Sequence, residues 1–308
     1  MTELENVIAQ EIRQQGAILF SRFMELALYH PQLGYYCRPR DPFGTEGDFY
    51  TAEQLQPVFG RLIAAYLRQL SEDATTVVEI GAGRGEMGES LSGFRYVPID
   101  IATGGTQVPQ IDTGIVFTNE LFDAIPVDLL VRDGDSIRER RVAIAGDRFI
   151  WDDGTLSDEQ IDERVMLLET QQHRIAMLTR IAHSVGSGFI VTIDYGYTRR
   201  ELIRFPEGTL MSYYRHAAVD DVLMRPGAQD ITAHVDWTAL QEHGATLELN
   251  TLRFESLASA LLRAGEADGF ATALSANDGA AEMRHRMQLK SLLFGMGETF
   301  QVLVQKKD

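Results

Sequence analysis

The spacing of hydrophobic positions divides the chain into alternating predicted helices and strands. Residues 3–30 repeat apolar side chains at helical intervals, and Pro31 ends this region. Short apolar runs with β-branched residues predict buried strands at 75–80, 94–101, 115–118 and 189–193. Helices are expected at 52–70, 86–91 and 158–185. Strands that alternate with helices in this way are typical of an α/β fold with a mostly parallel sheet.

Other segments do not follow this alternation. Residues 128–150 read as antiparallel hairpins with Asp-Gly and Gly-Asp turns, and 196–235 form a region rich in Gly, Pro and aromatic residues. The C-terminal part predicts a strand at 245–252, helices within 255–290 and a last strand at 299–305. We therefore expect one elaborated domain, with an N-terminal helical extension and cleft loop over 1–70. Its core would span 71–308, with insertions at about 128–155 and 196–240.

Composition narrows the class of protein. The 308 residues hold 28 Lys and Arg against 45 Asp and Glu, a formal net charge of -17 that argues against a nucleic-acid partner and fits a basic partner or a small ligand. The single cysteine, Cys37, excludes an internal disulfide and a Cys-based zinc site, and we expect no metal. Because there is neither a signal-peptide pattern nor an apolar run of 18 residues, we expect a cytoplasmic protein without a membrane span.

A glycine-rich loop follows the strand at 75–80. Glycines between a buried strand and a helix let a nucleotide-type cofactor approach the backbone closely. A dinucleotide fingerprint would place its third glycine at residue 86, which is Glu86, whereas the chain has Glu79-Ile80-Gly81-Ala82-Gly83-Arg84-Gly85. This E-x-G-x-G-x-G pattern resembles motif I of S-adenosylmethionine-dependent methyltransferases. Asp100 ends the next strand, where an acid can bind ribose hydroxyls of either cofactor type.

A second group of polar residues, Asn119 to Pro126, follows the strand at 115–118. Side chains at the carboxyl end of a parallel strand face the cofactor cleft. If a helical turn begins here, Glu120 and Asp123 share a face and can hold a guanidinium group with bidentate hydrogen bonds. Asn or Asp at a strand end is alternatively a simple helix cap.

Several motifs in order resemble one known family. They are Gly34-Tyr35-Tyr36, Gly47-Asp48-Phe49-Tyr50-Thr51, Val58-Phe59-Gly60, Glu79 to Gly85, Asn119 to Pro126, Asp194-Tyr195-Gly196, Gly208-Thr209-Leu210, Arg225-Pro226-Gly227 and Asp230 to Trp237. The chain resembles the MidA-like family of S-adenosylmethionine-dependent methyltransferases over about residues 17–240. The resemblance implies a Rossmann-like, seven-stranded methyltransferase fold. Mitochondrial members of that family are complex I assembly factors that methylate a protein arginine.

The resemblance also implies roles for particular residues. Those expected to hold S-adenosylmethionine are Gly47, Asp48, Thr51, Glu79, Gly81, Gly83, Gly85, Asp100 and Asn119. Glu120 and Asp123 would face the substrate, and His234 would line the active cleft. Apart from the resemblance, the chemistry of an imidazole makes His234 a candidate proton relay. Phe49, Asp194 and Tyr195 would line the cleft. Each of these last residues also has a plainer interpretation: His234 as a loop histidine, Asp194 as a cap, and the two aromatic residues as packing.

The chain departs from the family in two places. Only 14 residues separate Asp100 from Ile115, where the family has a longer segment with another helix and strand, and Thr51-Ala52-Glu53 replaces Thr-Ser-Pro. We predict a methyltransferase that modifies a protein side chain, arginine by resemblance, with homodimerisation left open. The alternatives are a scaffold protein that retains the fold, a small-molecule methyltransferase and, disfavoured by Glu86, a nicotinamide-dependent oxidoreductase.

Overall fold

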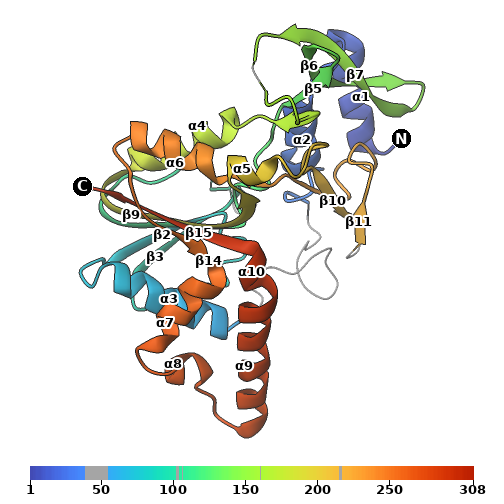
Figure 1. Cartoon of the computed structure of the whole chain (residues 1–308). Helices are drawn as coiled ribbons and strands as arrows, with labels where there is room; N and C mark the ends of the chain where they lie inside the picture. Colours follow the sequence, from blue (N-terminus) through green and yellow to red (C-terminus); the bar gives the residue numbers. More distant parts are fainter. Residues whose placement is uncertain (39–54, 102–103, 106, 160, 215–216) are drawn as a thin grey trace. The chain divides into compact units, whose positions relative to one another are not determined.

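The computed structural model describes residues 1–38, 55–101, 104–105, 107–159, 161–214 and 217–308. The chain forms two compact units (Figure 1). Unit 1 comprises Met1–Tyr50, Asp123–Ala176 and Tyr197–Ala239, and unit 2 comprises Thr51–Phe122, Met177–Gly196 and Leu240–Asp308. The first helices and both predicted insertions thus lie in unit 1, whereas the helix predicted at 52–70 lies in unit 2.

Unit 2 is built on one mixed sheet. Its strands are β2 (Thr76–Ile80), β3 (Arg95–Ile99), β4 (Ile111–Asn119), β9 (Val185–Tyr197, all but its last residue), β14 (Asn250–Ser256) and β15 (Phe300–Lys307). They lie in the order β14-β15-β9-β4-β2-β3. The pairs among β3, β2, β4 and β9 are parallel, and β15 runs antiparallel to both β9 and β14. This confirms the predicted Rossmann-like α/β class.

Apolar side chains of the strands and helices build the core of this unit. All five residues of β2 are buried, as expected for a strand covered on both faces. Helices α3 (Val58–Leu70) and α7 (Leu257–Glu266) contribute the apolar faces that pack on one side of the sheet (Figure 1). The remaining C-terminal helices are α8 (Ala271–Leu274), α9 (Gly279–Ser291), the π-helical turn η3 (Leu292–Met296) and α10 (Gly297–Thr299).

One predicted helix is absent, and another is shorter than predicted. The segment 86–91 forms turns, in which Gly88 N–H bonds the carbonyl of Gly85 at 2.9 Å, rather than a helix. The helix expected over 158–185 is confined to α4 (Gln172–Ser184). In the first half of the predicted helix, the Arg132 guanidinium instead binds the carbonyls of Ile161, Asp162 and Val165. A short strand, β8 (Leu167–Glu169), follows instead.

The short segment between β3 and β4 determines one border of the sheet. The described residues of 101–110 add no strand, and β3 is the last strand in the order on this side. The extra strand that the family places in this part of the chain is therefore absent from the described residues. Among the described residues, β3 pairs only with β2, on its inner side, and is therefore the edge strand of the sheet.

Unit 1 combines helices with two small antiparallel sheets. Its elements are α1 (Glu3–Gln15), β1 (Ile18–Leu19), α2 (Phe20–Tyr29), β5 (Leu129–Asp133), β6 (Ser136–Ala145), β7 (Arg148–Ser157), β8, α5 (Arg199–Leu202), β10 (Met211–Tyr214), β11 (Ala217–Val219), β12 (Asp230–Thr232) and β13 (Val235–Asp236). One sheet has the order β1-β6-β5-β8 with β7 beside β6, and the other has the order β11-β10-β12. The predicted hairpins are present, with Gly134 and Gly146 at positive φ in their turns. Helix α6 (Trp237–Thr246) leads back into unit 2.

No helix in the described part of the chain is long and apolar enough to cross a bilayer.

Candidate functional site

The carboxyl ends of three parallel strands meet at one edge of the unit 2 sheet. Ile80 of β2 is in register with Ile99 of β3 and with Thr118 of β4. The next residue of each strand is Gly81, Asp100 and Asn119, respectively. The register therefore brings together three residues that the sequence assigned separately to a cofactor, at the edge where ligands of doubly wound sheets bind.

The glycine loop has a backbone conformation that is strained for residues other than glycine. Gly81, Gly83 and Gly85 have φ values of 79°, 53° and 77°, in the left-handed region that glycine reaches without strain. The amides of Gly81 and Ala82 bond the Ile99 carbonyl at 2.8 and 3.2 Å, which ties the loop to β3. A Cβ at Gly81 would lie 3.1 Å from Leu121. The loop is thus a close backbone turn, as its sequence predicted.

Asp100, directly after the neighbouring strand β3, binds the backbone of the glycine loop. Its Oδ2 accepts a hydrogen bond from the Gly83 amide at 2.9 Å. The carboxylate is only half-buried, and it lies where an acid can bind ribose hydroxyls. This contact explains why an acid 17 residues after Gly83 belongs to the same site.

The Glu79 side chain is more deeply buried than its predicted contact with a cofactor suggested. Its side chain is fully buried, and it accepts a short hydrogen bond from the Tyr96 hydroxyl of β3. Tyr96 was not among the predicted site residues. Neither its spacing from Glu79 nor the local pattern singles it out, because the pair depends on strand pairing.

Asn119 presents an acceptor at the same edge. The residue is 4% exposed, and its Nδ2 donates to Glu120 Oε1 at 3.3 Å. Its buried Oδ1 has no hydrogen-bond partner among the described residues. A buried amide oxygen without a partner is costly, so a bound donor would stabilise it. The glycine loop, the Asp100 carboxylate and this oxygen fit S-adenosylmethionine, which offers ribose hydroxyls and an amino group.

The helical turn that would have put Glu120 and Asp123 on one face is absent. Glu120 has a φ of 52°, outside the helical region, and its amide bonds the Ile193 carbonyl at 2.9 Å. Residues 120–126 form bends and turns, and the chain passes from unit 2 to unit 1 between Phe122 and Asp123. The prediction of a shared helical face is therefore wrong. Glu120 extends the cofactor edge of unit 2, and Asp123 is a buried residue of unit 1.

Asp194 supports the backbone of this edge. Its side chain is fully buried, and its two oxygens accept the amides of Phe122 at 2.8 Å and of Tyr195 at 2.9 Å. The Tyr195 ring packs edge-on against Phe300, with centroids 5.4 Å apart. These contacts give Asp194 a positioning role for the turn after β4 and place the Tyr195 ring against the core.

His234 lies in unit 1, within an aromatic group. Its ring meets Tyr197 at 5.1 Å and Phe205 at 6.2 Å between centroids, and its amide donates to Thr209 Oγ1 at 2.9 Å. The buried Arg174 donates to the carbonyls of Ala233 and His234. Burial, and secondly the Arg174 charge, lowers the pKa of His234 to about 4, so the imidazole is neutral at pH 7. Its assignment as a proton relay stays a prediction.

Gly47, Asp48, Phe49 and Thr51 lie outside the described residues. Their predicted contributions to the cofactor site and the cleft therefore stay predictions.

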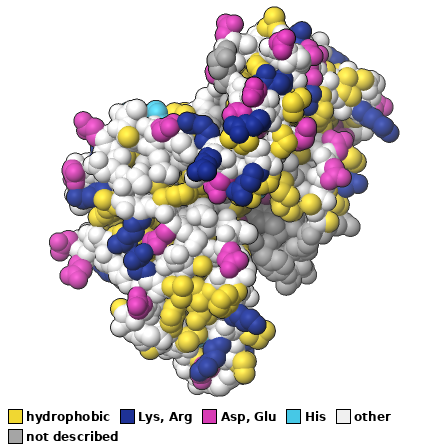
Figure 2. Space-filling view, viewed as in Figure 1, with side chains coloured by type: hydrophobic (Ala, Val, Ile, Leu, Met, Phe, Trp, Pro, Cys, Tyr) yellow, Lys and Arg dark blue, Asp and Glu magenta, His cyan; other side chains and the backbone are white. Residues whose placement is uncertain are grey.

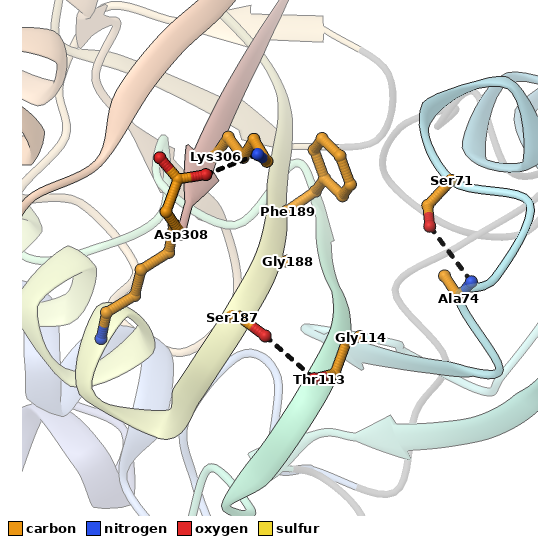
Figure 3. A pocket seen from close by; sticks show the side chains of 10 residues that line it. Ser71, Ala74, Thr113, Gly114, Ser187, Gly188, Phe189, Lys306 and Asp308 are labelled. Carbon is orange, nitrogen blue, oxygen red and sulfur yellow. Dashed lines mark hydrogen bonds and ion pairs between the residues drawn. The ribbon is translucent and has the colours of Figure 1, made fainter.

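A cavity of about 360 Å³ opens at the opposite end of the parallel strands (Figure 3). Its lining includes Gly114 near the start of β4 and Ser187 near the start of β9. The polar groups in it bond one another: Thr113 with Ser187 at 2.9 Å, and Lys306 with Asp308. Because cofactors of such sheets bind at the carboxyl ends, this cavity is not the cofactor site.

Comparisons with known proteins agree with this site. Residues 102–255, half of the chain, match a family described as S-adenosyl-L-methionine-dependent methyltransferases. A crystal structure from Burkholderia thailandensis with bound S-adenosyl-homocysteine superposes with a TM-score of 0.88 and 28% identity, covering 99% of this chain and 92% of that one. A second Burkholderia thailandensis structure gives a TM-score of 0.85, also at 28% identity, over 99% of this chain and 91% of that one.

Curated relatives extend the comparison. The mitochondrial protein arginine methyltransferase NDUFAF7 of Rattus norvegicus is 23% identical over 78% of this chain and 69% of its own length. The Danio rerio protein of the same name is 24% identical over 76% and 70%, respectively. The family match, the SAH-bound neighbour and the glycine edge agree on one cofactor. The chain belongs to the MidA-like family of S-adenosyl-L-methionine-dependent methyltransferases.

Proposed function

We propose that the protein methylates the guanidinium group of an arginine side chain in a protein substrate. The observation that carries the proposal is a carboxylate, Glu120, directly after Asn119 at the cofactor edge of unit 2. A carboxylate there favours a cationic acceptor. The names of the curated relatives, protein arginine methyltransferase, support the same acceptor.

The residues of the chain would bind and orient the reactants. S-adenosylmethionine supplies a methyl group on a sulfonium, which needs no further activation. Gly81, Gly83, Asp100 and Asn119 would hold the donor, and Glu120 would hold an N–H of the guanidinium and take its proton. The guanidinium group stays protonated at neutral pH because its pKa is very high, so a group that accepts the proton is needed for the nitrogen to act as a nucleophile. Positioning then provides most of the rate enhancement.

The net charge of -17 adds little to this specificity. In Figure 2 acidic and basic side chains are interspersed over the face shown. Such mixing favours solubility, and the local carboxylates would select the acceptor. A cytoplasmic location and a homodimer are further proposals from the sequence.

Labelled methyl transfer tests the proposed function. The protein is incubated with methyl-tritiated S-adenosylmethionine and a whole extract of cells that lack it. The extract is then separated into protein and small-molecule fractions, and the hydrolysed protein fraction is searched for labelled methylarginine. Glu120→Gln should lower incorporation by about 100-fold, because a lost proton acceptor has effects of that size. S-adenosyl-homocysteine affinity, measured by calorimetry, should be unchanged in this variant.

Three other results would redirect the interpretation. Label in another amino acid would overturn the arginine acceptor, and label in the small-molecule fraction would favour a small-molecule methyltransferase. Failure of the wild-type protein to bind S-adenosylmethionine at millimolar concentration would favour a scaffold protein.

A further inference from the structure

Strand β7 of unit 1 has one side that no described strand occupies. It pairs with β6 along its other side, and the two strands form a hairpin (Figure 1). β6 itself is paired on both sides, because β1 and β7 both pair with it at Val142. Backbone amides and carbonyls along an open strand edge can bond the backbone of a further strand.

The turn before β7 determines which of its backbone groups point toward the open side. Ala145 pairs with Arg148 across a two-residue turn. The closing pair of such a hairpin is hydrogen-bonded, and bonded and non-bonded positions then alternate along the strands. Phe149 and Trp151 therefore direct their amides and carbonyls outward, whereas Ile150 between them bonds β6.

The side chains on one face of β7 are exposed and available for contacts. Ile150 is a large hydrophobic residue, yet it is 42% exposed. Arg148 and Asp152 lie on the same face, since alternate residues of a strand share a face. Both are exposed, and neither makes a hydrogen bond or ion pair through its side chain with a described residue. Arg141, which lies opposite Asp152 on β6, binds Glu139 instead.

These residues make the strand complementary to itself in one register. Two identical strands that pair across a two-fold axis run antiparallel, and residues with outward-directed backbone groups lie opposite one another. An axis at Ile150 meets this condition and places Arg148 opposite Asp152 of the second copy. An axis at Trp151 would place Ile150 opposite Asp152 of the second copy. An axis at Asp152 would place two carboxylates opposite each other, which is unfavourable.

The inner face of β7 supports the same register. Phe149 and Trp151 pack against the core of unit 1. Trp151 meets Phe20 at 5.3 Å and Phe149 meets Phe23 at 5.5 Å between ring centroids. With an axis at Ile150, Phe149 lies opposite Trp151 of the second copy. Aromatic pairs that face each other across antiparallel strands stabilise a sheet.

We propose that β7 pairs with β7 of a second copy of this chain, antiparallel about a two-fold axis at Ile150. The pairing would join the β6–β7 sheets of the two copies into one continuous sheet. It concerns unit 1 alone and does not depend on the proposed acceptor. The regular run of β7 ends at Asp153, after which a bulge shifts its register with β6. A contact this short is smaller than a standard interface, so we expect a dissociation constant on the order of 10 μM.

Sedimentation and hydrogen exchange test the pairing on the full chain. Between about 1 and 200 μM protein, sedimentation velocity should show a reversible change from monomer to dimer. The amides of Phe149 and Trp151 should exchange about fivefold more slowly at the upper concentration, because they are bonded only in the dimer. A dimer without this protection would overturn the proposal. A monomer at the upper concentration would also overturn it, and would make an extended segment of another protein the better candidate for this edge.

Two charge substitutions test the register. Arg148→Glu and Asp152→Arg each place like charges opposite one another in a homodimer, so each variant should dimerise at least about tenfold more weakly than the wild type. When the two variants are mixed, the substituted side chains face each other with opposite charges, and a heterodimer of near wild-type affinity should form. A mixture that does not associate would overturn the register.

Two lysine substitutions on the same strand form a matched pair. Ile150→Lys places a charge at the axis and should weaken dimerisation by at least about tenfold. Leu156→Lys, at a 62% exposed position beyond the regular run, should leave dimerisation unchanged. Thermal unfolding of the monomers and S-adenosyl-homocysteine binding in unit 2 should be unaltered in both variants. Equal dimerisation of Ile150→Lys and the wild type would overturn the proposal.

Discussion

The cofactor edge of unit 2 and the region of unit 1 around Tyr36 and Asp230 are built in different ways. At the edge, the site is formed mainly by backbone conformation. Three glycines have positive φ, two amides bond the Ile99 carbonyl, and the strand register aligns Gly81, Asp100 and Asn119. In the region around Tyr36 and Asp230, side chains from segments far apart in sequence bond one another, as in the Tyr36–Asp230 contact across 194 positions.

Because of this difference, different kinds of substitution should impair the two regions. A site made of backbone is sensitive to any change that alters φ, and it binds a ligand common to many proteins. A region held by side-chain contacts can change through single substitutions without loss of the fold. The comparison therefore predicts that cofactor binding fails through backbone strain, whereas unit 1 changes through the loss of single side-chain contacts.

The largest expected effect comes from a side chain in the glycine loop. Gly83→Val places a β-branched residue at a φ of 53°, so the loop must move away from Asp100. S-adenosyl-homocysteine affinity should fall by at least about 100-fold, and methyl transfer should be abolished. Calorimetry and the labelled-methyl assay measure the two effects.

A glycine of similar conformation in unit 1 is the control. Gly146→Ala has a comparable φ of 61° and open space around the added Cβ. It should cost about 1 kcal/mol in stability and leave cofactor binding unchanged. Full activity of Gly83→Val would remove the loop from the site.

An intermediate effect is expected at Asp194. Asp194→Ala removes a buried carboxylate that accepts two backbone amides, from Phe122 and Tyr195. Loss of two charge-assisted bonds should lower the free energy of unfolding by about 3 kcal/mol, measured by urea denaturation. Asp194→Asn retains one acceptor and should lose about half as much. Equal stability of the alanine variant would show that the carboxylate does not hold the turn after β4.

The smallest expected effect is a pH dependence in unit 1. The folded pKa of His234, lowered to about 4, lies below its unfolded value of about 6.5. The unfolded chain binds the extra proton between these values, so this contribution to stability is complete above pH 6.5 and is lost as pH falls toward 4. Between pH 7.5 and 5 the loss should be about 2 kcal/mol.

A substitution isolates the part of this loss due to His234. His234→Gln should flatten the pH profile in urea denaturation, and the same substitution at the exposed His183 should leave the wild-type slope. An unchanged profile in His234→Gln would place the imidazole in water, contrary to its packing on Tyr197 and Phe205.

The cofactor site was predictable because its signals are local. Glu79 to Gly85 lies in one stretch after a buried strand, and Asp100 follows at the end of the next strand. Once the strands are placed, parallel pairing brings the loop and the acid together. The MidA-like family and its cofactor followed from these residues and the motifs around them.

The side-chain contacts of unit 1 were not predictable in the same way. The motifs at Tyr35-Tyr36 and Asp230 to Trp237 were visible in the sequence, but nothing local indicated that Tyr36 bonds Asp230. The helical turn predicted at Glu120 is absent. Glu120 has a left-handed backbone conformation, and its amide bonds the carbonyl of Ile193, which is distant in sequence. Tertiary contacts decided both outcomes.

The edge strand β3 also has consequences for association between molecules. Unpaired strand edges invite pairing with other chains and lead to aggregates. In β3 the Arg95 amide and the Ile99 carbonyl both bond toward β2, so the alternate residues, Tyr96 and Pro98, direct their backbone groups outward. Proline has no amide hydrogen, so this edge lacks one of the two outward donors that an incoming strand would need. The shorter chain between β3 and β4 thus leaves an edge protected against intermolecular β-pairing.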